Sequence, residues 1–351
     1  MRKPTRPAVT LVRLVPLATA LALLTACGSG TEDDGAPPAD PTTAATADAA
    51  ADPADDPADD PADDPADDPA DDAAEDGVPV SVTDDTGAEI TLDQPASRVA
   101  CLTMMCVDAL TEVGLTPVAY RDPLALDERY AGPGADMREV TGGFGEENVE
   151  DVVLSEPDLV IGLAGAQDGL RDAVEQAAPL YLVDPASWQD SVAFLRTVGD
   201  LTGTRTLADE RADAFTERVE AAAADRSDLT LLSMYGEPGS LGVDTVGTPV
   251  GSLLAEVADY PWPAGSDPFA TVAVEQVAKV DPDIVFAQAF SASEDAEPLS
   301  ERLAADPTWA RLSAARADRV VEVEADVWAT GRGTISLGLV LDEVEATLAA
   351  S

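Results

Sequence analysis

The sequence contains no histidine in its 351 residues. Serine and cysteine hydrolases place a histidine base beside the nucleophile, so both catalytic arrangements are excluded. Zinc and related metals are commonly held by histidine clusters, so a direct transition-metal site is disfavoured. An enzyme would have to use carboxylates alone, and with 68 acidic residues a carboxylate pair carries no specificity. We therefore expect no enzymatic activity, no catalytic residues, no resident metal and no cofactor.

Basic residues are scarce, at 20 against 68 acidic ones, and the formal net charge is −48. Four of the basic residues precede position 14, which leaves 16 basic and 50 acidic side chains in residues 78–351. Nucleic acid requires a basic surface, so we expect no nucleic-acid partner. The excess of negative charge does not specify a fold.

Only three cysteines are present, and the first follows a short apolar run. Basic residues precede the apolar residues 14–24, and the run ends in Leu24, Thr25, Ala26 and Cys27. This pattern predicts a secretory signal over residues 1–26 and matches a lipobox, after which Cys27 becomes the lipidated first residue. Two acyl chains on one cysteine give durable anchoring, so we expect a lipoprotein on the outer face of the cell membrane.

Cys101 and Cys106 remain in an oxidising compartment. A disulfide between them would restrain the intervening residues. A pair of buried free thiols is an equal alternative, since the two positions need not meet the required Cα separation. Thiolate ligation of a metal centre is a third, more remote interpretation.

Residues 27–77 contain almost no apolar side chain except alanine, and five consecutive PADD units occupy residues 53–72. Eighteen acidic residues and no basic ones lie in this segment. Proline, repulsion and low hydrophobicity together predict a disordered, extended tether. It would either cross an anionic cell wall or act as a plain spacer.

Residues 78–351 alternate short apolar runs with helical patterns, which indicates an α/β fold with largely parallel sheets. The expected strands are residues 99–102, 117–120, 159–163, 180–183, 229–235, 284–287 and 319–323. Residues 204–225 lack a helix breaker and have an apolar face, so they predict one long helix. That helix would join an N-terminal lobe, 78–203, to a C-terminal lobe, 226–351.

Five segments, in order, resemble one family. They are SVTDDTGAEITLDQPASRVACL (81–102), NVEDVVLSEPDLVIG (148–162), TRTLADERADAFTERVEAA (204–222), VAVEQVAKVDPDIVF (272–286) and WARLSAARADRVVEVEADVW (309–328). By these five segments the chain resembles the siderophore and vitamin B12 type (class III) of ABC transporter substrate-binding lipoproteins. The resemblance implies two Rossmann-like lobes joined by a rigid helix, with the ligand held between them.

The resemblance also implies a function. We expect a monomer that captures a ferric siderophore, a small-molecule iron chelate, outside the membrane and delivers it to an ABC permease and its ATPase. Cobalamin or haem is the alternative ligand of the same fold, and a surface haem relay or sensor is the alternative role. Haem would need Tyr, Met or Cys ligation, because histidine is absent.

Candidate ligand-binding residues directly follow the expected strands, where the loops of open α/β sheets converge. They are Met104, Met105, Tyr120, Arg121, Phe144, Tyr235, Trp328 and Arg332. Arginine suits an anionic chelate because its planar, permanently charged group can stack or donate two hydrogen bonds. The plain alternatives are surface ion pairs for the arginines, and core packing for the aromatic residues and methionines.

Two glutamates match positions that the family places on exposed lobe tips, Glu150 in NVE and Glu275 in VEQV. In the family such carboxylates meet arginine pockets on the permease. We therefore expect Glu150 and Glu275 to be docking residues. The alternative is that both are ordinary solvated acids.

Overall fold

The computed structural model describes residues 79–123, 126, 129–130, 136–265, 271–288 and 297–351. The expected signal segment, Cys27 and the PADD tether lie outside the described residues. Within the described ranges, no helix combines the length and the apolar character that crossing a bilayer would require.

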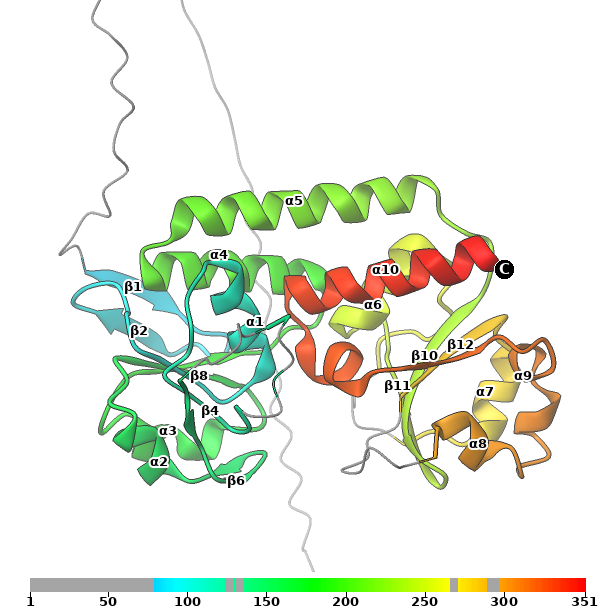
Figure 1. Ribbon diagram of the computed structural model, residues 1–351, viewed down its shortest axis with the longest axis horizontal. Coiled ribbons are helices and arrows are strands. Elements are labelled where there is room, and N and C mark those ends of the chain that lie inside the picture. The colour runs from blue at the N-terminus through cyan, green and yellow to red at the C-terminus, as the bar shows by residue number, and fades with distance from the viewer. Residues whose placement is uncertain (1–78, 124–125, 127–128, 131–135, 266–270, 289–296) are drawn as a thin grey trace, which may run out of the picture. The chain divides into compact units, whose positions relative to one another are not determined.

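The N-terminal lobe, residues 79–203, is built on a five-stranded sheet of order β5-β4-β3-β8-β9 in which all the pairs are parallel (Figure 1). Its strands are β3 (Val99–Cys101), β4 (Ala119–Tyr120), β5 (Arg138–Glu139), β8 (Leu159–Leu163) and β9 (Leu180–Val183). The central strands are wholly buried, as a parallel sheet covered on both faces requires. The lobe's other elements are α1 (Met104–Glu112), β6 (Gly142–Gly143), β7 (Glu146–Glu147), α2 (Val149–Leu154), η1 (Asp168–Leu170), α3 (Arg171–Val174) and α4 (Trp188–Thr202).

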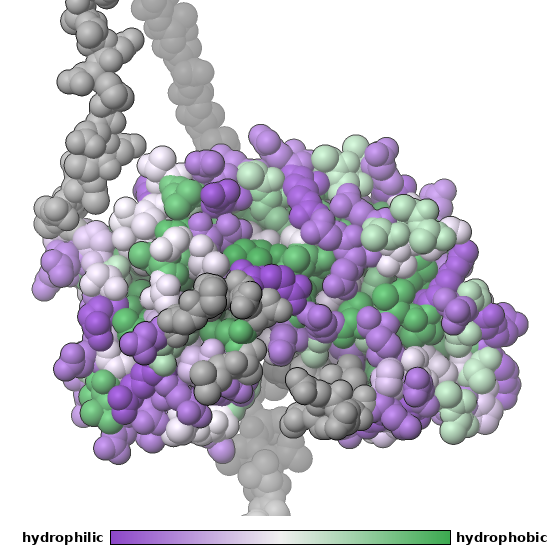
Figure 2. All heavy atoms as spheres, viewed as in Figure 1, coloured by the Kyte–Doolittle hydropathy of each residue, from purple (hydrophilic) through white to green (hydrophobic). Residues whose placement is uncertain are grey.

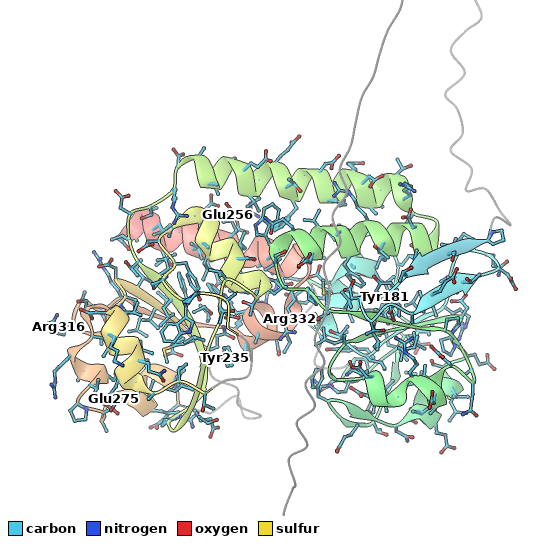
Figure 3. The ribbon with its side chains drawn as sticks, turned by 180° about the vertical axis from the view of Figure 1, so that it is seen from behind. Tyr181, Tyr235, Glu256, Glu275, Arg316 and Arg332 are labelled. Atoms are coloured by element: carbon cyan, nitrogen blue, oxygen red, sulfur yellow. A yellow bond between two sulfur atoms is a disulfide. The ribbon has the colours of Figure 1, made fainter. Side chains whose placement is uncertain are left out.

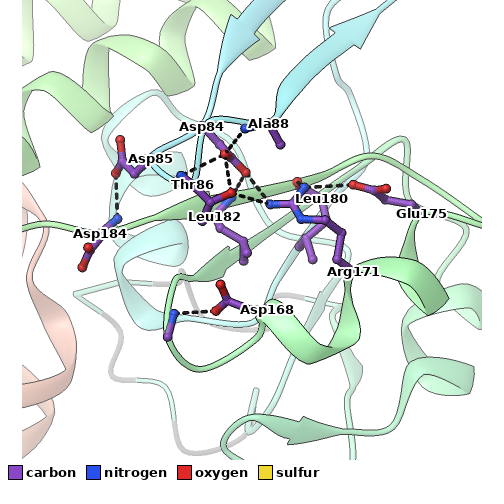
Figure 4. A network of polar contacts seen from close by, with 11 residues as sticks. Asp84, Asp85, Thr86, Ala88, Asp168, Arg171, Glu175, Leu180, Leu182 and Asp184 are labelled. Atoms are coloured by element: carbon purple, nitrogen blue, oxygen red, sulfur yellow. Dashed lines mark hydrogen bonds and ion pairs between the residues drawn. The ribbon is translucent and has the colours of Figure 1, made fainter. Parts of the chain in front are cut away.

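A hairpin of β1 (Val80–Thr83) and β2 (Glu89–Leu92) is fixed to this sheet through its DDTG turn (Figure 4). The buried Asp84 carboxylate accepts a hydrogen bond from the Leu182 amide at 3.3 Å and pairs with Arg171 at 2.5 Å. Asp85 donates its amide to the Leu182 carbonyl and accepts the Asp184 amide at 2.7 Å. The turn thus satisfies backbone groups at the outer edge of β9, which an exposed edge would leave unpaired.

The C-terminal lobe, residues 226–351, has a four-stranded sheet of order β11-β10-β12-β13. The strands are β10 (Leu231–Glu237), β11 (Ser240–Val243), β12 (Ile284–Gln288) and β13 (Val320–Val323), and only the β10–β11 pair is antiparallel. The lobe's helices are α6 (Pro249–Val257), α7 (Val274–Val280), α8 (Leu299–Leu303), η2 (Trp309–Arg311), α9 (Ser313–Arg316), a π-helix η3 (Asp326–Gly331) and α10 (Thr334–Ala350).

Between the lobes the chain forms one long helix, α5 (Arg205–Ala224), which runs across both in Figure 1. Helix α4 ends at Gly203, whose φ of +71° is the left-handed conformation common after a helix. The chain then reverses, and α5 packs back along α4, with Phe215 against Trp188 at a ring separation of 6.1 Å. The predicted α/β class with two lobes is confirmed.

The largest apolar core is continuous from one lobe into the other. Residues of α1 and α4 in the N-terminal lobe share it with residues of α6 and α10 in the C-terminal lobe. A second, smaller core lies in the N-terminal lobe under α2 and α3. On the face seen in Figure 2, hydrophilic residues are spread over the surface, with hydrophobic residues showing in separate areas between them.

Candidate functional site

A cleft of about 680 Å³ opens between the two lobes, at the carboxyl ends of strands from both sheets. Residues of both lobes line it: Leu102, Thr103, Met104, Tyr120, Arg121, Phe144, Leu163, Ala164, Gly165, Asp184, Pro185 and Ala186 from the N-terminal lobe, and Tyr235, Asp244, Gly247, Thr248, Pro249, Val250, Trp328, Ala329, Thr330 and Arg332 from the C-terminal lobe. Its volume falls in the usual range for small-molecule sites.

On the N-terminal side, Tyr120 and Arg121 come directly after β4, and Phe144 lies in the turn between β6 and β7. The Arg121 guanidinium carbon lies 5.9 Å from the centre of the Phe144 ring, a cation–π contact. Phe144 is 52% exposed. Among the described residues, Arg121 has no carboxylate in ion-pair contact. Burial raises the pKa of the Tyr120 phenol, which keeps the hydroxyl protonated.

The turn that carries Phe144 is anchored by a buried carboxylate. Glu147 is 3% exposed, and its Oε1 accepts hydrogen bonds from the Gly145 amide at 3.1 Å and from Gln167 Nε2 at 2.9 Å. The side-chain oxygen of Gln167 in turn accepts the Leu163 amide at the end of β8. Phe144 is therefore attached to the sheet through its turn, while its ring stays open to solvent.

On the C-terminal side, Arg332 lies between η3 and α10, with a left-handed backbone (φ +59°) that is uncommon for a non-glycine residue. Its Nε donates to the Ala329 carbonyl at 3.0 Å. In the described part of the chain, no carboxylate makes an ion pair with Arg332. Figure 3 shows Arg332 near the middle of the molecule, on the side of its lobe that faces the other lobe.

Asp244 is a cleft residue that the sequence did not suggest. Its carboxylate accepts hydrogen bonds from Ser233 Oγ at 2.6 Å and Thr248 Oγ1 at 3.1 Å, and Gln288 donates to the same serine. Burial raises the pKa of Asp244, and these hydrogen bonds and the charge of Arg332 oppose part of that rise. Its position directly after the end of β11 is the signal that could have indicated it.

Two of the predicted ligand residues are core residues. Trp328 is 0% exposed; its ring stacks on Phe286 at 4.7 Å, and its Nε1 donates to Glu343 at 2.8 Å. It forms part of the cleft floor without presenting its ring to solvent. Met105 is fully buried and does not line the cleft, whereas its neighbour Met104 does.

Tyr235 also lines the cleft, and its ring lies against the backbone of Gly242, where any Cβ would overlap the ring. On the opposite wall, Leu102, Thr103 and Met104 lie between two disulfide-bonded cysteines. Cys101 and Cys106 are buried and their Cα atoms are 5.5 Å apart.

The two expected docking residues lie outside the cleft. Glu150 is exposed in the first turn of α2, and Glu275 is exposed in the first turn of α7, well away from Arg332 in Figure 3. The two side chains therefore belong to different lobes. Within the described ranges, no group of three or more Cys, Asp or Glu side chains is arranged to hold a metal ion.

Comparison with known families gives one match over most of the chain. The model of a family described as "Periplasmic binding protein" matches residues 99–327.

Individual proteins are similar at low identity. The Fe(3+) dicitrate-binding periplasmic protein FecB of Escherichia coli K12 is 23% identical over 259 residues, which cover 72% of this chain and 85% of FecB. The Fe(3+)-citrate-binding protein YfmC of Bacillus subtilis 168 is 23% identical over 261 residues, covering 72% of this chain and 81% of YfmC. The crystal structure of the petrobactin-binding protein YclQ from Bacillus subtilis superimposes with a TM-score of 0.65 at 14% identity, over 77% of this chain and 98% of that one.

Proposed function

Because the chain belongs to the periplasmic binding protein family, we propose that it captures a ferric siderophore in the cleft between its lobes and delivers it to an ABC importer. The family resemblance carried by the five sequence segments is confirmed. The family is one of binding proteins, which supports our proposal that the cleft holds its ligand without transforming it.

The choice of ligand rests on two arginines that line the cleft and form no ion pair with a described carboxylate. Arg121 and Arg332 come from opposite walls, and neither has an ion-pair partner among the described residues. In a chain with 68 acidic side chains, two guanidinium groups in one cleft that form no direct ion pair with a described carboxylate favour an anionic ligand, although the nearby charge of Asp244 acts on Arg332. Phe144, Tyr120 and Tyr235 add flat surfaces for the organic part of a chelate.

The relatives support the same ligand class. FecB and YfmC are named for binding ferric citrate, a small anionic iron chelate, and YclQ is named for binding the siderophore petrobactin. A cleft of about 680 Å³ accommodates chelates of this size. Iron is then cargo inside its chelate, and the protein supplies the charges and surfaces around it.

We place the protein outside the cytoplasm, on the outer face of the cell membrane. The basic and apolar N-terminal segment, the lipobox that ends at Cys27 and the extracytoplasmic relatives support this location. The PADD segment would then hold the lobes away from the membrane, and a monomer suffices because one chain contains both walls of the cleft.

For delivery, Glu150 and Glu275 are proposed to dock the two lobes onto two halves of the permease. Both are exposed, and charge-assisted pairs with arginines would fix the orientation of the complex. Changing both to Ala should leave chelate affinity unchanged and abolish uptake or stimulation of the ATPase. The matched control changes Glu210 and Glu220, two exposed acids of α5, and should leave transport intact. Normal transport by the E150A/E275A protein would remove the docking assignment.

Titration of intrinsic tryptophan fluorescence tests the ligand. Ferric dicitrate, a ferric hydroxamate, a ferric catecholate, cobalamin and haem are each added to the purified protein. Saturable quenching at one equivalent by a ferric chelate, without chemical change in the chelate, is the expected result. Binding of only cobalamin or haem would replace the proposed ligand, and turnover of any compound would replace the proposed function.

A further inference from the structure

The N-cap residue of α10 has no side chain to cap the helix, and within α10 only Ser336 Oγ turns back, to accept the Gly333 amide at 3.0 Å. Its N-cap residue is Gly333, although a 17-residue helix leaves several amide groups unsatisfied at its first turn. Serine, threonine, asparagine or aspartate usually accepts these hydrogen bonds. Here the acceptor comes from another helix, in the other lobe.

That acceptor is Asp108 of α1, which is 0% exposed. Its Oδ1 accepts the Ile335 amide at 3.0 Å, and its Oδ2 accepts the Ser336 amide at 2.9 Å and Ser336 Oγ at 2.7 Å. A Cβ at Gly333 would overlap the Asp108 carboxyl group, so a glycine is needed for this approach. Burial raises the pKa of Asp108 to about 7, and the hydrogen bonds from Ser336 and Ile335 at the helix N-terminus oppose part of that rise.

A second contact reinforces the first. One turn further along α1, Glu112 Oε1 accepts a hydrogen bond from Thr334 Oγ1 at 3.0 Å, and Arg211 of α5 lies 3.9 Å from the same carboxylate. Three consecutive residues of α10, Thr334 to Ser336, are thus held by two acids of the N-terminal lobe.

Arg332 stands two residues before this clamped turn. Its left-handed backbone sets the direction in which the chain leaves η3, and its Nε is bonded back to the carbonyl of Ala329. Any displacement of the start of α10 would therefore move the Arg332 backbone within the cleft. The position of Arg332 therefore depends on the position of the first turn of α10, since only Gly333 separates the two.

We propose that Asp108 is a positioning residue, by which the N-terminal lobe fixes Arg332 of the C-terminal lobe in its ligand-binding position. This inference rests on the proposed function, because it takes Arg332 to contact the ligand. Asp108 itself is buried and is not among the residues that line the cleft.

A double-mutant cycle tests the coupling in the full chain, with the ferric chelate that quenches the parent most strongly as the probe. D108N should weaken binding about 10-fold, as expected when a charge-assisted contact loses its geometry. In a protein that already carries R332Q, the same D108N change should weaken binding less than about twofold. The control D342N makes the same chemical change on the exposed side of α10, and should have no effect on affinity.

An equal loss of affinity from D108N with and without R332Q would overturn the proposal, because Asp108 would then act through general stability. So would an unchanged affinity in D108N itself. If the parent protein binds none of the ferric chelates, the proposed function is wrong. The contact between Asp108 and the start of α10 can then still be tested without a ligand.

Amide hydrogen exchange provides that second test. D108N should speed exchange at least about 10-fold in peptides covering residues 329–337, while D342N leaves them protected. Unchanged protection of these residues in D108N would overturn the proposal whatever the ligand is.

Discussion

Arg121 of the N-terminal lobe and Arg332 of the C-terminal lobe line the same cleft, but they are held in different ways. Arg121 rests on the exposed ring of Phe144, with no further partner among the described residues. Arg332 is fixed by its backbone, its bond to Ala329 and the capped start of α10. Arg332 is therefore held by more contacts than Arg121 before any ligand binds.

Phe144 and Trp328, two aromatic residues from opposite walls, also differ in exposure. Phe144 is 52% exposed, while Trp328 is 0% exposed, stacked on Phe286 and hydrogen-bonded to Glu343. Exposed rings contribute their surface to the ligand, and buried rings contribute it to folding.

The largest expected effect separates these two rings. W328A should lower the free energy of unfolding by about 4 kcal/mol, because it leaves a cavity in the core and an unpaired Glu343. F144A should change it by less than about 0.5 kcal/mol and weaken chelate binding instead. Urea unfolding of the ligand-free proteins measures both. A small loss of stability in W328A would mean that Trp328 serves the ligand and not the core.

Asp84 of the N-terminal lobe and Asp244 of the C-terminal lobe should respond to pH in opposite directions. Burial of Asp84 opposes its ionisation, but hydrogen bonds from Thr86, the Ala88 and Leu182 amides and Arg171 together hold its pKa below the usual range. Its contribution to stability is present above about pH 4 and is lost as the pH falls below that value. D84N should therefore cost about 3 kcal/mol at pH 7, and the difference from the parent should vanish in acid. E175Q, which removes the exposed partner of the same arginine, should cost about 0.3 kcal/mol.

Asp244 in the C-terminal lobe has a raised pKa because of its burial. Its contribution to stability is greatest below about pH 4 and falls as the pH rises through the raised pKa. The stability difference between the parent and D244N should therefore shrink with rising pH, where the difference for D84N grows. Parallel pH profiles for the two variants, measured by thermal unfolding, would contradict this contrast between Asp84 and Asp244.

The loops on the two sides of the cleft are restrained in different ways, and removing each restraint should cause a smaller loss of stability. Removing the N-terminal disulfide with C101A/C106A should cost about 2 kcal/mol, the loop entropy of a short closed ring. The facing loop of the C-terminal lobe is held by the Thr248 cap of α6, and T248A should cost about 1 kcal/mol. Chemical unfolding with and without reductant checks both values, and a reductant effect in C101A/C106A would contradict the assignment.

Most of the sheet framework could be predicted from apolar runs. Residues 159–163 and 180–183 form β8 and β9 as predicted, and the helix predicted at 204–225 is α5. A parallel strand that is buried on both faces has a continuous run of apolar residues. Such a run can be recognised in the sequence without knowledge of the tertiary structure. The predicted apolar face of α5 is buried at Phe215 and Val219.

The features that set the cleft depend on contacts between distant residues. Asp108 accepts the amides of Ile335 and Ser336, which lie 227 and 228 positions further along the chain. A local sequence pattern cannot predict a helix cap that comes from another helix. β11 is not among the predicted strands, because its short run SLGV lacks a strong strand pattern. Trp328 and Met105 follow strands as predicted, yet their side chains point into the core, because a position after a strand does not determine which way a side chain turns.

The central claim is that one arginine from each lobe holds an anionic ferric chelate in the cleft. Isothermal titration of ferric dicitrate, or of the ferric chelate that binds most tightly, into the parent, R121Q, R332Q and R121Q/R332Q proteins tests it most directly. We expect affinity to fall about 5-fold for R121Q, about 30-fold for R332Q and at least about 100-fold for the double variant, with thermal unfolding unchanged. An affinity within about twofold of the parent in the double variant would contradict the account.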